Sequence, residues 1–190
     1  MRFLFLILFL TGAKIGSAQL QRYQTAQPKM GSPFYLVLYT TDSVTAHQKA
    51  TAAFALIDSL NAIFSDYDSS SELSRLSATA GKDSAVLVSS LLYDMMVQSK
   101  KSYKESGGTF DITIGPLSRL WRKVRRERSF PSVVQIESAK RETGMDKIVI
   151  DTITKKVKLL QAGMQLDVGG IGKGYIAQAV IDFLKREGIT

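Results

Sequence analysis

The residues with the clearest chemical potential lie in one short stretch, "DVGGIGKGYIAQAV", at positions 167–180. It combines four glycines with the carboxylate of Asp167 and the ammonium of Lys173, between a predicted strand at 164–168 and a predicted helix at Tyr175–Glu187. The first turn of a helix has unpaired N–H groups and the positive end of the helix dipole, which together bind anions such as phosphate. The stretch therefore predicts a phosphate-binding turn, with a tight turn that serves only close packing as the alternative.

The familiar nucleotide motifs do not fit this stretch. A P-loop needs a glycine five residues before the Gly-Lys pair and a Ser or Thr after it, but Asp167 and Gly174 occupy those positions. A dinucleotide fingerprint needs G-x-G-x-x-G, whereas Gly170, Gly172 and Gly174 form G-x-G-x-G. A phosphate bound here would be held by the helix N-terminus and by Lys173 rather than by either motif.

Few other residues are candidates for chemistry. Asp111 lies among apolar neighbours in "SGGTFDITIGPL", so its carboxylate must either cap the following turn or accept hydrogen bonds from a polar ligand. Tyr67 and Trp121 are able to stack on a flat ring, although such residues more often belong to a core. His47 has no second ligand nearby and is predicted at the surface, which also leaves no Ser/His/Asp triad. The basic run 122–128 is predicted to be a solvated surface, with contact to a phosphate or an acidic partner as the alternative.

The elements that must position these residues alternate between strands and helices. Residues 19–32 are polar and predict a linker that becomes ordered near Met30, and "PFYLVLYTT" at 33–41 predicts a strand. A long helix capped by Asp42 or Ser43 follows. Its predicted buried face has the spacing of one helix side and comprises Ala50, Ala53, Phe54, Ile57, Leu60 and Phe64.

The second half of the chain adds shorter elements. The polar segment 65–84 predicts a loop with one helical turn at "SELSRL", followed by a strand at 85–88. A helix capped by Ser89 ends at Gly107-Gly108, with a predicted buried face of Leu91, Leu92, Met95, Met96 and Tyr103. A short helix at 132–143, a hairpin at 147–160 and a strand at 164–168 complete the pattern. This mixture favours an α+β fold, with a mixed or antiparallel sheet packed against helices.

Composition restricts the class of protein. The chain has 190 residues and no cysteine, so its core must be held by packing, and thiolate metal sites and cysteine nucleophiles are excluded. Residues 1–18, "MRFLFLILFLTGAKIGSA", predict a cleaved secretory signal, and an uncleaved anchor is the alternative. Its removal leaves 23 basic and 17 acidic residues, a net charge near +6 that identifies no partner by itself. The end of the sequence places Lys185, Arg186 and Gly188 in the last turn and C-cap of a helix, and Ile189 at the start of a strand.

Four segments together resemble the ApbE-type FAD:protein FMN transferases in order and spacing. They are Met30-Gly31, "FSDYDSSSELSRL" at 64–76, "SGGTFDITIGPLSRLW" at 106–121 and "LDVGGIGKGYIAQAVIDFL" at 166–184. The likeness covers nearly all of residues 19–190, which would form one domain, incomplete at its C-terminal end. Each segment alone is weakly specific, but the last two in this order are quite specific.

The resemblance implies particular roles for residues of this chain. Met30 and Tyr67 would lie against the flavin or adenine part of FAD. Asp167 would contact FAD, and Lys173 would lie near it. Thr109, Phe110 and Asp111 would form a second wall of the FAD site, with Asp111 hydrogen-bonding the ligand. Gly170 would bind magnesium through its backbone carbonyl.

The resemblance also implies an activity and a location. Members of the family are exported, use Mg²⁺ and transfer FMN from FAD to a threonine hydroxyl of an acceptor protein, releasing AMP. The implied acceptor is a flavin-carrying subunit of a membrane electron-transport complex, with no nucleic acid partner. The implied location is periplasmic or extracytoplasmic, soluble or loosely membrane-associated. The alternatives are a non-catalytic periplasmic FAD-binding protein and a hydrolase that splits FAD into FMN and AMP.

The sequence departs from the family in three respects. The family continues with a strand, a Gly-Gly-Asp segment and a late Asp/Thr cluster that supplies the side-chain magnesium ligands, all beyond Thr190. Gln178 stands where the family often has an aspartate, and the signal lacks a lipobox cysteine. If these 190 residues were the whole product, we would expect weak or absent catalysis and impaired FAD binding.

Overall fold

The first element of the fold is a β-hairpin. The computed structural model describes residues 19–189, in which β1 (Gln21–Lys29) pairs antiparallel with β2 (Ser32–Thr40) along its whole length. Met30 and Gly31 connect the strands, and both have positive φ angles, 50° and 72°, as expected for the primed turn of a two-residue hairpin. The prediction of a linker at 19–32 is wrong because the apolar strand β2 supplies a backbone partner for its polar sequence. The strand predicted at 33–41 is confirmed.

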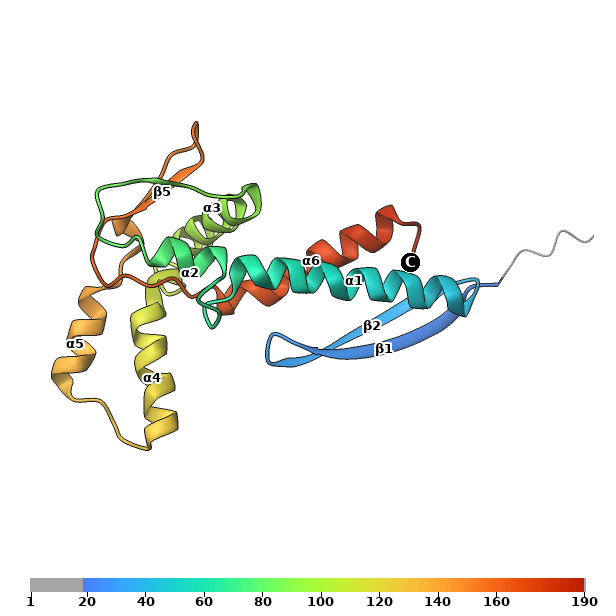
Figure 1. The fold of residues 1–190 in the computed structure, drawn as a ribbon, viewed down its shortest axis with the longest axis horizontal. Coiled ribbons are helices and arrows are strands. Elements are labelled where there is room, and N and C mark those ends of the chain that lie inside the picture. The colour runs from blue at the N-terminus through green and yellow to red at the C-terminus, as the bar shows by residue number, and fades with distance from the viewer. Residues whose placement is uncertain (1–18, 190) are drawn as a thin grey trace, which may run out of the picture.

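Helix α1 (Ser43–Phe64) packs on the hairpin and beside α6 (Gly169–Arg186), so that these elements form one end of the molecule (Figure 1). Its N-cap is Asp42, whose Oδ1 accepts the N–H of Thr45 at 2.8 Å. The predicted helix and its buried face are confirmed, since every apolar residue assigned to that face is buried. An ion pair of 2.6 Å between Lys29 and Asp58 also joins the hairpin to α1.

The charge of this cap is expected to affect stability in acid. Hydrogen bonding from Thr45 lowers the pKa of Asp42 below its usual 3.8. A carboxylate with a lowered pKa stabilises the fold above its unfolded-state pKa, and this contribution is lost as the pH falls through the folded-state pKa. Asp42→Asn keeps a capping oxygen but removes the charge, so thermal unfolding from neutral pH down to about pH 2 should show a smaller acid loss in the variant. Equal acid slopes for the two proteins would contradict this assignment.

The other end of the molecule contains short helices around a small sheet (Figure 1). The sheet is antiparallel in the order β3–β5–β4. The predicted hairpin at 147–160, the helix after Ser132 and the helical turn in the 65–84 loop are all confirmed. The elements are α2 (Glu72–Ser77), β3 (Val86–Leu87), α3 (Ser90–Glu105), the 3₁₀ turn η1 (Ile112–Ile114), α4 (Gly115–Glu127), α5 (Val133–Arg141), the 3₁₀ turn η2 (Met145–Lys147), β4 (Ile148–Ile150) and β5 (Lys156–Leu159).

Several predicted details are wrong. Residues 164–168 are not a strand, because their backbone makes hydrogen bonds to a side chain and to a 3₁₀ turn rather than to another strand. Leu166 N–H donates to Ser77 Oγ, and Asp167 N–H donates to the Ile112 carbonyl. Leu91 is 39% exposed, although Leu92, Met95 and Met96 are buried as predicted. Ile189 is buried, and the strand predicted to start there would continue beyond the described residues, so it stays a prediction. The predicted secretory signal at 1–18 lies outside the described residues.

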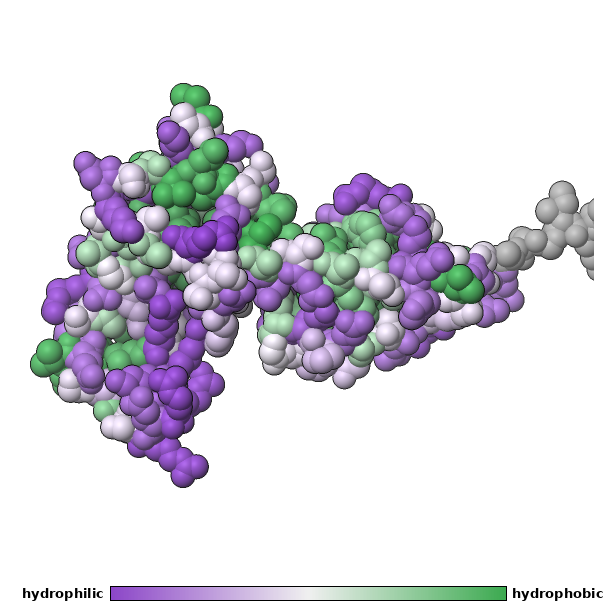
Figure 2. Space-filling view, viewed as in Figure 1, coloured by the Kyte–Doolittle hydropathy of each residue, from purple (hydrophilic) through white to green (hydrophobic). Residues whose placement is uncertain are grey.

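One hydrophobic cluster runs through both ends of the molecule and includes residues of α1, α3, the small sheet and α6. Figure 2 shows the two ends joined through a narrower waist. The α+β class with antiparallel sheets packed against helices is therefore confirmed. Among residues 19–189, no helix combines the length and the apolar character that crossing a bilayer requires.

Candidate functional site

A cavity of about 1190 Å³ lies where the two ends of the molecule meet. Its walls come from the β1–β2 turn, the C-terminal end of α1 with the loop after it, the segment between α3 and η1, the inner face of α4 and the first turns of α6. All eight residues that the sequence assigned to the site line this cavity: Met30, Tyr67, Thr109, Phe110, Asp111, Asp167, Gly170 and Lys173. The fold thus brings together segments more than 130 residues apart, whereas the ligand contact assigned to each residue stays a prediction.

The glycine-rich stretch is the start of α6 rather than a separate turn, since the helix begins at Gly169 and not at Tyr175. Asp167 precedes it, and its Oδ1 accepts the N–H of Gly169 at 2.8 Å. The N–H of Gly170 has no hydrogen-bond acceptor among the described residues, and Gly170 is exposed. A Cβ at Gly170 would lie 3.2 Å from the Phe110 ring, so glycine at this position allows the ring to lie close to the helix end. The arrangement can receive an anion.

Lys173 connects α6 to the hairpin. Its Nζ donates to Ser32 Oγ at 2.9 Å, next to the Met30-Gly31 turn that lines the cavity. An ammonium has three N–H donors, and Lys173 uses one of them within residues 19–189, which leaves two for a ligand. The lysine therefore places a positive charge one turn inside the start of α6. It is held there by Ser32 of the hairpin, part of the segment that was predicted to be a linker.

Asp111 combines the structural and the functional interpretations. Its Oδ1 caps η1 by accepting the N–H and the hydroxyl of Thr113, at 2.7 and 2.6 Å. Thr113 is fully buried, and its hydroxyl oxygen in turn accepts the N–H of Gly144 at 2.7 Å. Within the described residues, Asp111 Oδ2 makes no hydrogen bond. One oxygen is thus fixed by the fold, and the other is available to a donor in the cavity.

Arg122 and its partner Asp66 are site residues that the sequence analysis missed. Arg122 belongs to the basic run that was assigned to the surface. The structure places it in the cavity wall, with Nη1 at 2.5 Å from Asp66 Oδ2 and Nη2 at 3.0 Å from Asp167 Oδ2. Its guanidinium carbon lies 4.0 Å from the centroid of the Tyr67 ring. The positions of Ile114, Ser118 and Arg122 in the cavity wall follow a spacing of four, and this helical spacing was the available signal.

Charge and burial fix the protonation state of this group. Desolvation lowers the pKa of Arg122, but hydrogen bonding to Asp66 and the charges of Asp66 and Asp167 outweigh it, so that the pKa is raised above its ordinary value and the guanidinium stays charged. The side chains of Asp66 and Asp167 are only 10% and 11% exposed. Since two nearly buried carboxylates share one guanidinium, removal of the arginine would leave both without their cation.

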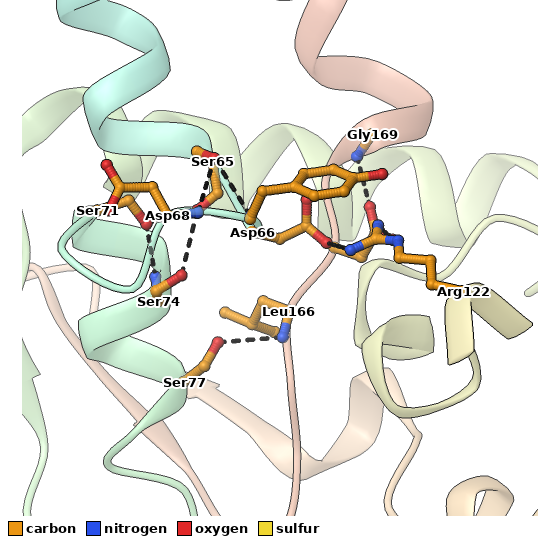
Figure 3. A network of polar contacts seen from close by, with 11 residues as sticks. Ser65, Asp66, Asp68, Ser71, Ser74, Ser77, Arg122, Leu166 and Gly169 are labelled. Carbon is orange, nitrogen blue, oxygen red and sulfur yellow. Dashed lines mark hydrogen bonds and ion pairs between the residues drawn. The ribbon is translucent and has the colours of Figure 1, made fainter. Parts of the chain in front are cut away.

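Serine side chains hold the loop that carries Asp66 and Tyr67 (Figure 3). The carbonyl of Ser65 accepts the hydroxyls of Ser71 and Ser74, and Ser65 Oγ accepts the N–H groups of Tyr67 and Asp68. The same view shows Arg122 extending from α4 toward Asp66 and the Gly169 end of α6. The loop is therefore tied to α2 on one side and to Arg122 on the other.

The remaining candidates lie on the surface. His47 is exposed, as predicted. Trp121 is 44% exposed, and Tyr67, although it lines the cavity, is 78% exposed, so neither is a core residue. Hydrophilic side chains cover the C-terminal end of α4 (Figure 2), which agrees with the prediction for the basic run apart from Arg122. Within residues 19–189, no three His, Asp or Glu side chains lie together as a metal site would require.

Comparison with known proteins gives the cavity a context. The model of the ApbE family matches residues 30–190. The FAD:protein FMN transferase of Klebsiella pneumoniae is 31% identical over 165 residues, 87% of this chain and 51% of the relative, and that of Haemophilus influenzae is 27% identical over 163 residues, 83% and 47%. The chain spans about half the length of the curated relatives it matches.

Solved structures agree in fold. The flavin transferase ApbE from Vibrio cholerae superposes with a TM-score of 0.80 at 23% identity, covering 90% of this chain and 55% of that one. The apo form of the flavinyl transferase ApbE from Pseudomonas stutzeri gives 0.79 at 27% identity, with the same coverage. The family match begins at Met30 in the cavity and includes every segment that lines it. The chain belongs to the ApbE family.

Proposed function

We propose that this chain carries the nucleotide-binding half of an FAD:protein FMN transferase. The single observation that supports this most strongly is the cavity at the start of α6, which gathers an open helix N-terminus, a lysine, three carboxylates and three aromatic rings. These groups suit the parts of FAD: N–H groups and Lys173 for the pyrophosphate, Tyr67 and Phe110 for flat rings, and carboxylate oxygens for the N–H and O–H groups of rings and riboses.

In the proposed reaction the protein binds, orients and neutralises. The hydroxyl oxygen of an acceptor threonine forms a bond to the FMN phosphorus, the bond from that phosphorus to the bridging oxygen breaks, AMP leaves and the hydroxyl proton is released. The free N–H of Gly170, the positive end of α6 and Lys173 would stabilise the charge on the pyrophosphate oxygens. The Phe110 ring lies beside Gly170 and would exclude water from that side of the phosphates.

The proposal includes a dependence on Mg²⁺, with the Gly170 carbonyl as the ligand predicted within this chain. Bound Mg²⁺ neutralises phosphate oxygens in phosphoryl transfer. The described residues do not by themselves fit a magnesium site, because they contain no cluster of three metal-binding side chains and Mg²⁺ requires a near-octahedral set of oxygen ligands. We therefore assign no step of the reaction to the metal.

We further propose that residues 1–18 direct export and that the protein acts in the periplasm, soluble or loosely membrane-associated. The proposed acceptor is a flavin-carrying subunit of a membrane electron-transport complex. The support for export is the Arg2-led apolar run followed by small residues before Gln19. Since the chain spans about half of its relatives, FAD binding without catalysis is the second candidate function for these residues alone.

The test is a transfer assay with the complete product of the gene. The protein is incubated with FAD, Mg²⁺ and an acceptor that contains the target threonine, and the acceptor is weighed by mass spectrometry. We expect a mass gain of one FMN minus one water, together with free AMP. Free FMN and AMP without a mass gain would indicate hydrolysis, bound flavin without AMP would indicate a binding protein, and either result would overturn the proposed transfer.

A further inference from the structure

Tyr67 is an aromatic residue whose two faces have different environments. Tyr67 is 78% exposed, yet the guanidinium of Arg122 covers one face of its ring, with the guanidinium carbon 4.0 Å from the ring centroid. The backbone on either side is held by Ser65 Oγ, which accepts the N–H groups of Tyr67 and Asp68 at 3.2 Å. The guanidinium thus supports one face of the ring, and the other face is open toward the cavity that Tyr67 lines.

The guanidinium under this ring is itself fixed. Its two terminal nitrogens are paired with Asp66 and Asp167, which come from the α1–α2 loop and from the start of α6. The Arg122 side chain is 23% exposed, and both carboxylates are more buried than that. Because two carboxylates from separate segments hold one planar cation, its orientation under the ring is determined by the fold rather than by the tyrosine.

We propose that Arg122 is a positioning residue that makes Tyr67 a stacking platform for a flat heteroaromatic ring of the bound nucleotide. This inference rests on the proposed function and assigns a role to a residue outside the predicted site. The ligand ring lies on the open face of Tyr67, and the guanidinium lies on the other, so the three form a stack of cation, phenol and heterocycle. The isoalloxazine and the adenine of FAD share this chemistry.

An arginine is required for this arrangement. Its planar fork contacts two carboxylates and an aromatic face at once, whereas a lysine has a single compact ammonium on a flexible stem. Arg122→Lys therefore preserves the charge between Asp66 and Asp167 but removes the flat support of the ring. A role limited to neutralising the carboxylates would be satisfied by lysine, so this substitution separates positioning from charge balance.

The experiment measures dissociation constants for FAD, riboflavin and AMP by titration. The variants are Arg122→Lys, Tyr67→Ala and the double variant, with thermal unfolding measured for each. Arg126→Lys is the matched control, since Arg126 lies one turn further along α4 with a side chain that is 75% exposed. We expect Arg122→Lys to weaken FAD binding about five- to tenfold without loss of the folded state, and Arg126→Lys to leave it unchanged.

The double variant tests whether Arg122 acts through Tyr67. If it does, adding Arg122→Lys to Tyr67→Ala weakens FAD binding no further. Unchanged FAD affinity in Arg122→Lys, or single effects that multiply in the double variant, would overturn the inference. A parallel loss of riboflavin binding assigns the platform to the flavin ring, and a parallel loss of AMP binding assigns it to adenine. These binding effects without FMN transfer would overturn only the proposed function, whereas an unmodified protein that binds none of the three ligands would overturn both.

Discussion

Replacement of Gly115 by alanine is expected to lower the free energy of unfolding by about 3 kcal/mol. Gly115 is buried at the first position of α4, and a Cβ there would lie 2.4 Å from the carbonyl oxygen of Gln165. Because the obstacle is backbone, a rotamer change cannot relieve the clash, and either α4 or the segment 164–168 must move. That segment leads directly to Asp167, so the same substitution should also weaken ligand binding.

Gly174→Ala is the matched control for this prediction. Gly174 lies inside α6, and a Cβ there would meet no atom within 4 Å. Alanine is favoured over glycine in a helix by roughly 0.5–1 kcal/mol, so this variant should unfold at the same or a higher temperature. The predicted loss in Gly115→Ala corresponds to a decrease of roughly 6–12 °C in Tm. Equal Tm values for the two variants would contradict the close packing of α4 on the segment before α6.

Asp167→Ala is expected to weaken FAD binding roughly 10- to 100-fold, the range of a hydrogen bond to a charged group. Asp167 uses one oxygen to cap Gly169 and the other to hold Arg122. Each carboxylate oxygen has a further lone pair, which we expect to accept a hydrogen bond from the nucleotide. The substitution removes this acceptor and also releases one side of Arg122, so that the support of Tyr67 is weakened.

Two further variants separate these contributions. Asp167→Asn keeps an oxygen for the Gly169 N–H but loses the charge that pairs with Arg122, so its affinity for FAD should lie between those of the unmodified protein and Asp167→Ala. Asp182→Ala, an exposed position of α6, should bind FAD normally. Equal affinities for Asp167→Ala and Asp182→Ala, measured by flavin titration, would remove Asp167 from the site.

The long periodic elements could be predicted from the sequence because their local signals agree. Helix α1 has a capping signal at Asp42 or Ser43 and apolar residues at helical spacing, and the structure confirms the helix with Asp42 as its cap. The hairpin strand β1 was missed because its sequence is polar, and it is a strand only through pairing with β2. The segment 164–168 was wrongly predicted to be a strand because its sequence is typical of one. It pairs with no strand among residues 19–189, and its backbone hydrogen bonds go to Ser77 and Ile112.

The residues of the candidate site were gathered from four segments by family resemblance, and the fold brings all of them to one cavity. Physical reasoning from composition alone could not have paired Asp66 and Asp167 with Arg122, because these residues are far apart in sequence and meet only through tertiary packing. Arg122 was assigned to the surface with the rest of the basic run, of whose other six residues five are indeed exposed. Helical spacing from Ile114 was the one local clue.

The most direct measurement of the central claim is hydrogen exchange of the protein with and without FAD. The claim is that one cavity, formed by the β1–β2 turn, the loop after α1, the segment before η1 and the start of α6, binds the nucleotide. We predict slower exchange on FAD addition in residues 30–31, 65–67, 108–111 and 167–173, with no change at the exposed C-terminal end of α4. Exchange that is unchanged in these four segments at saturating FAD, or slowed only elsewhere, would contradict the account.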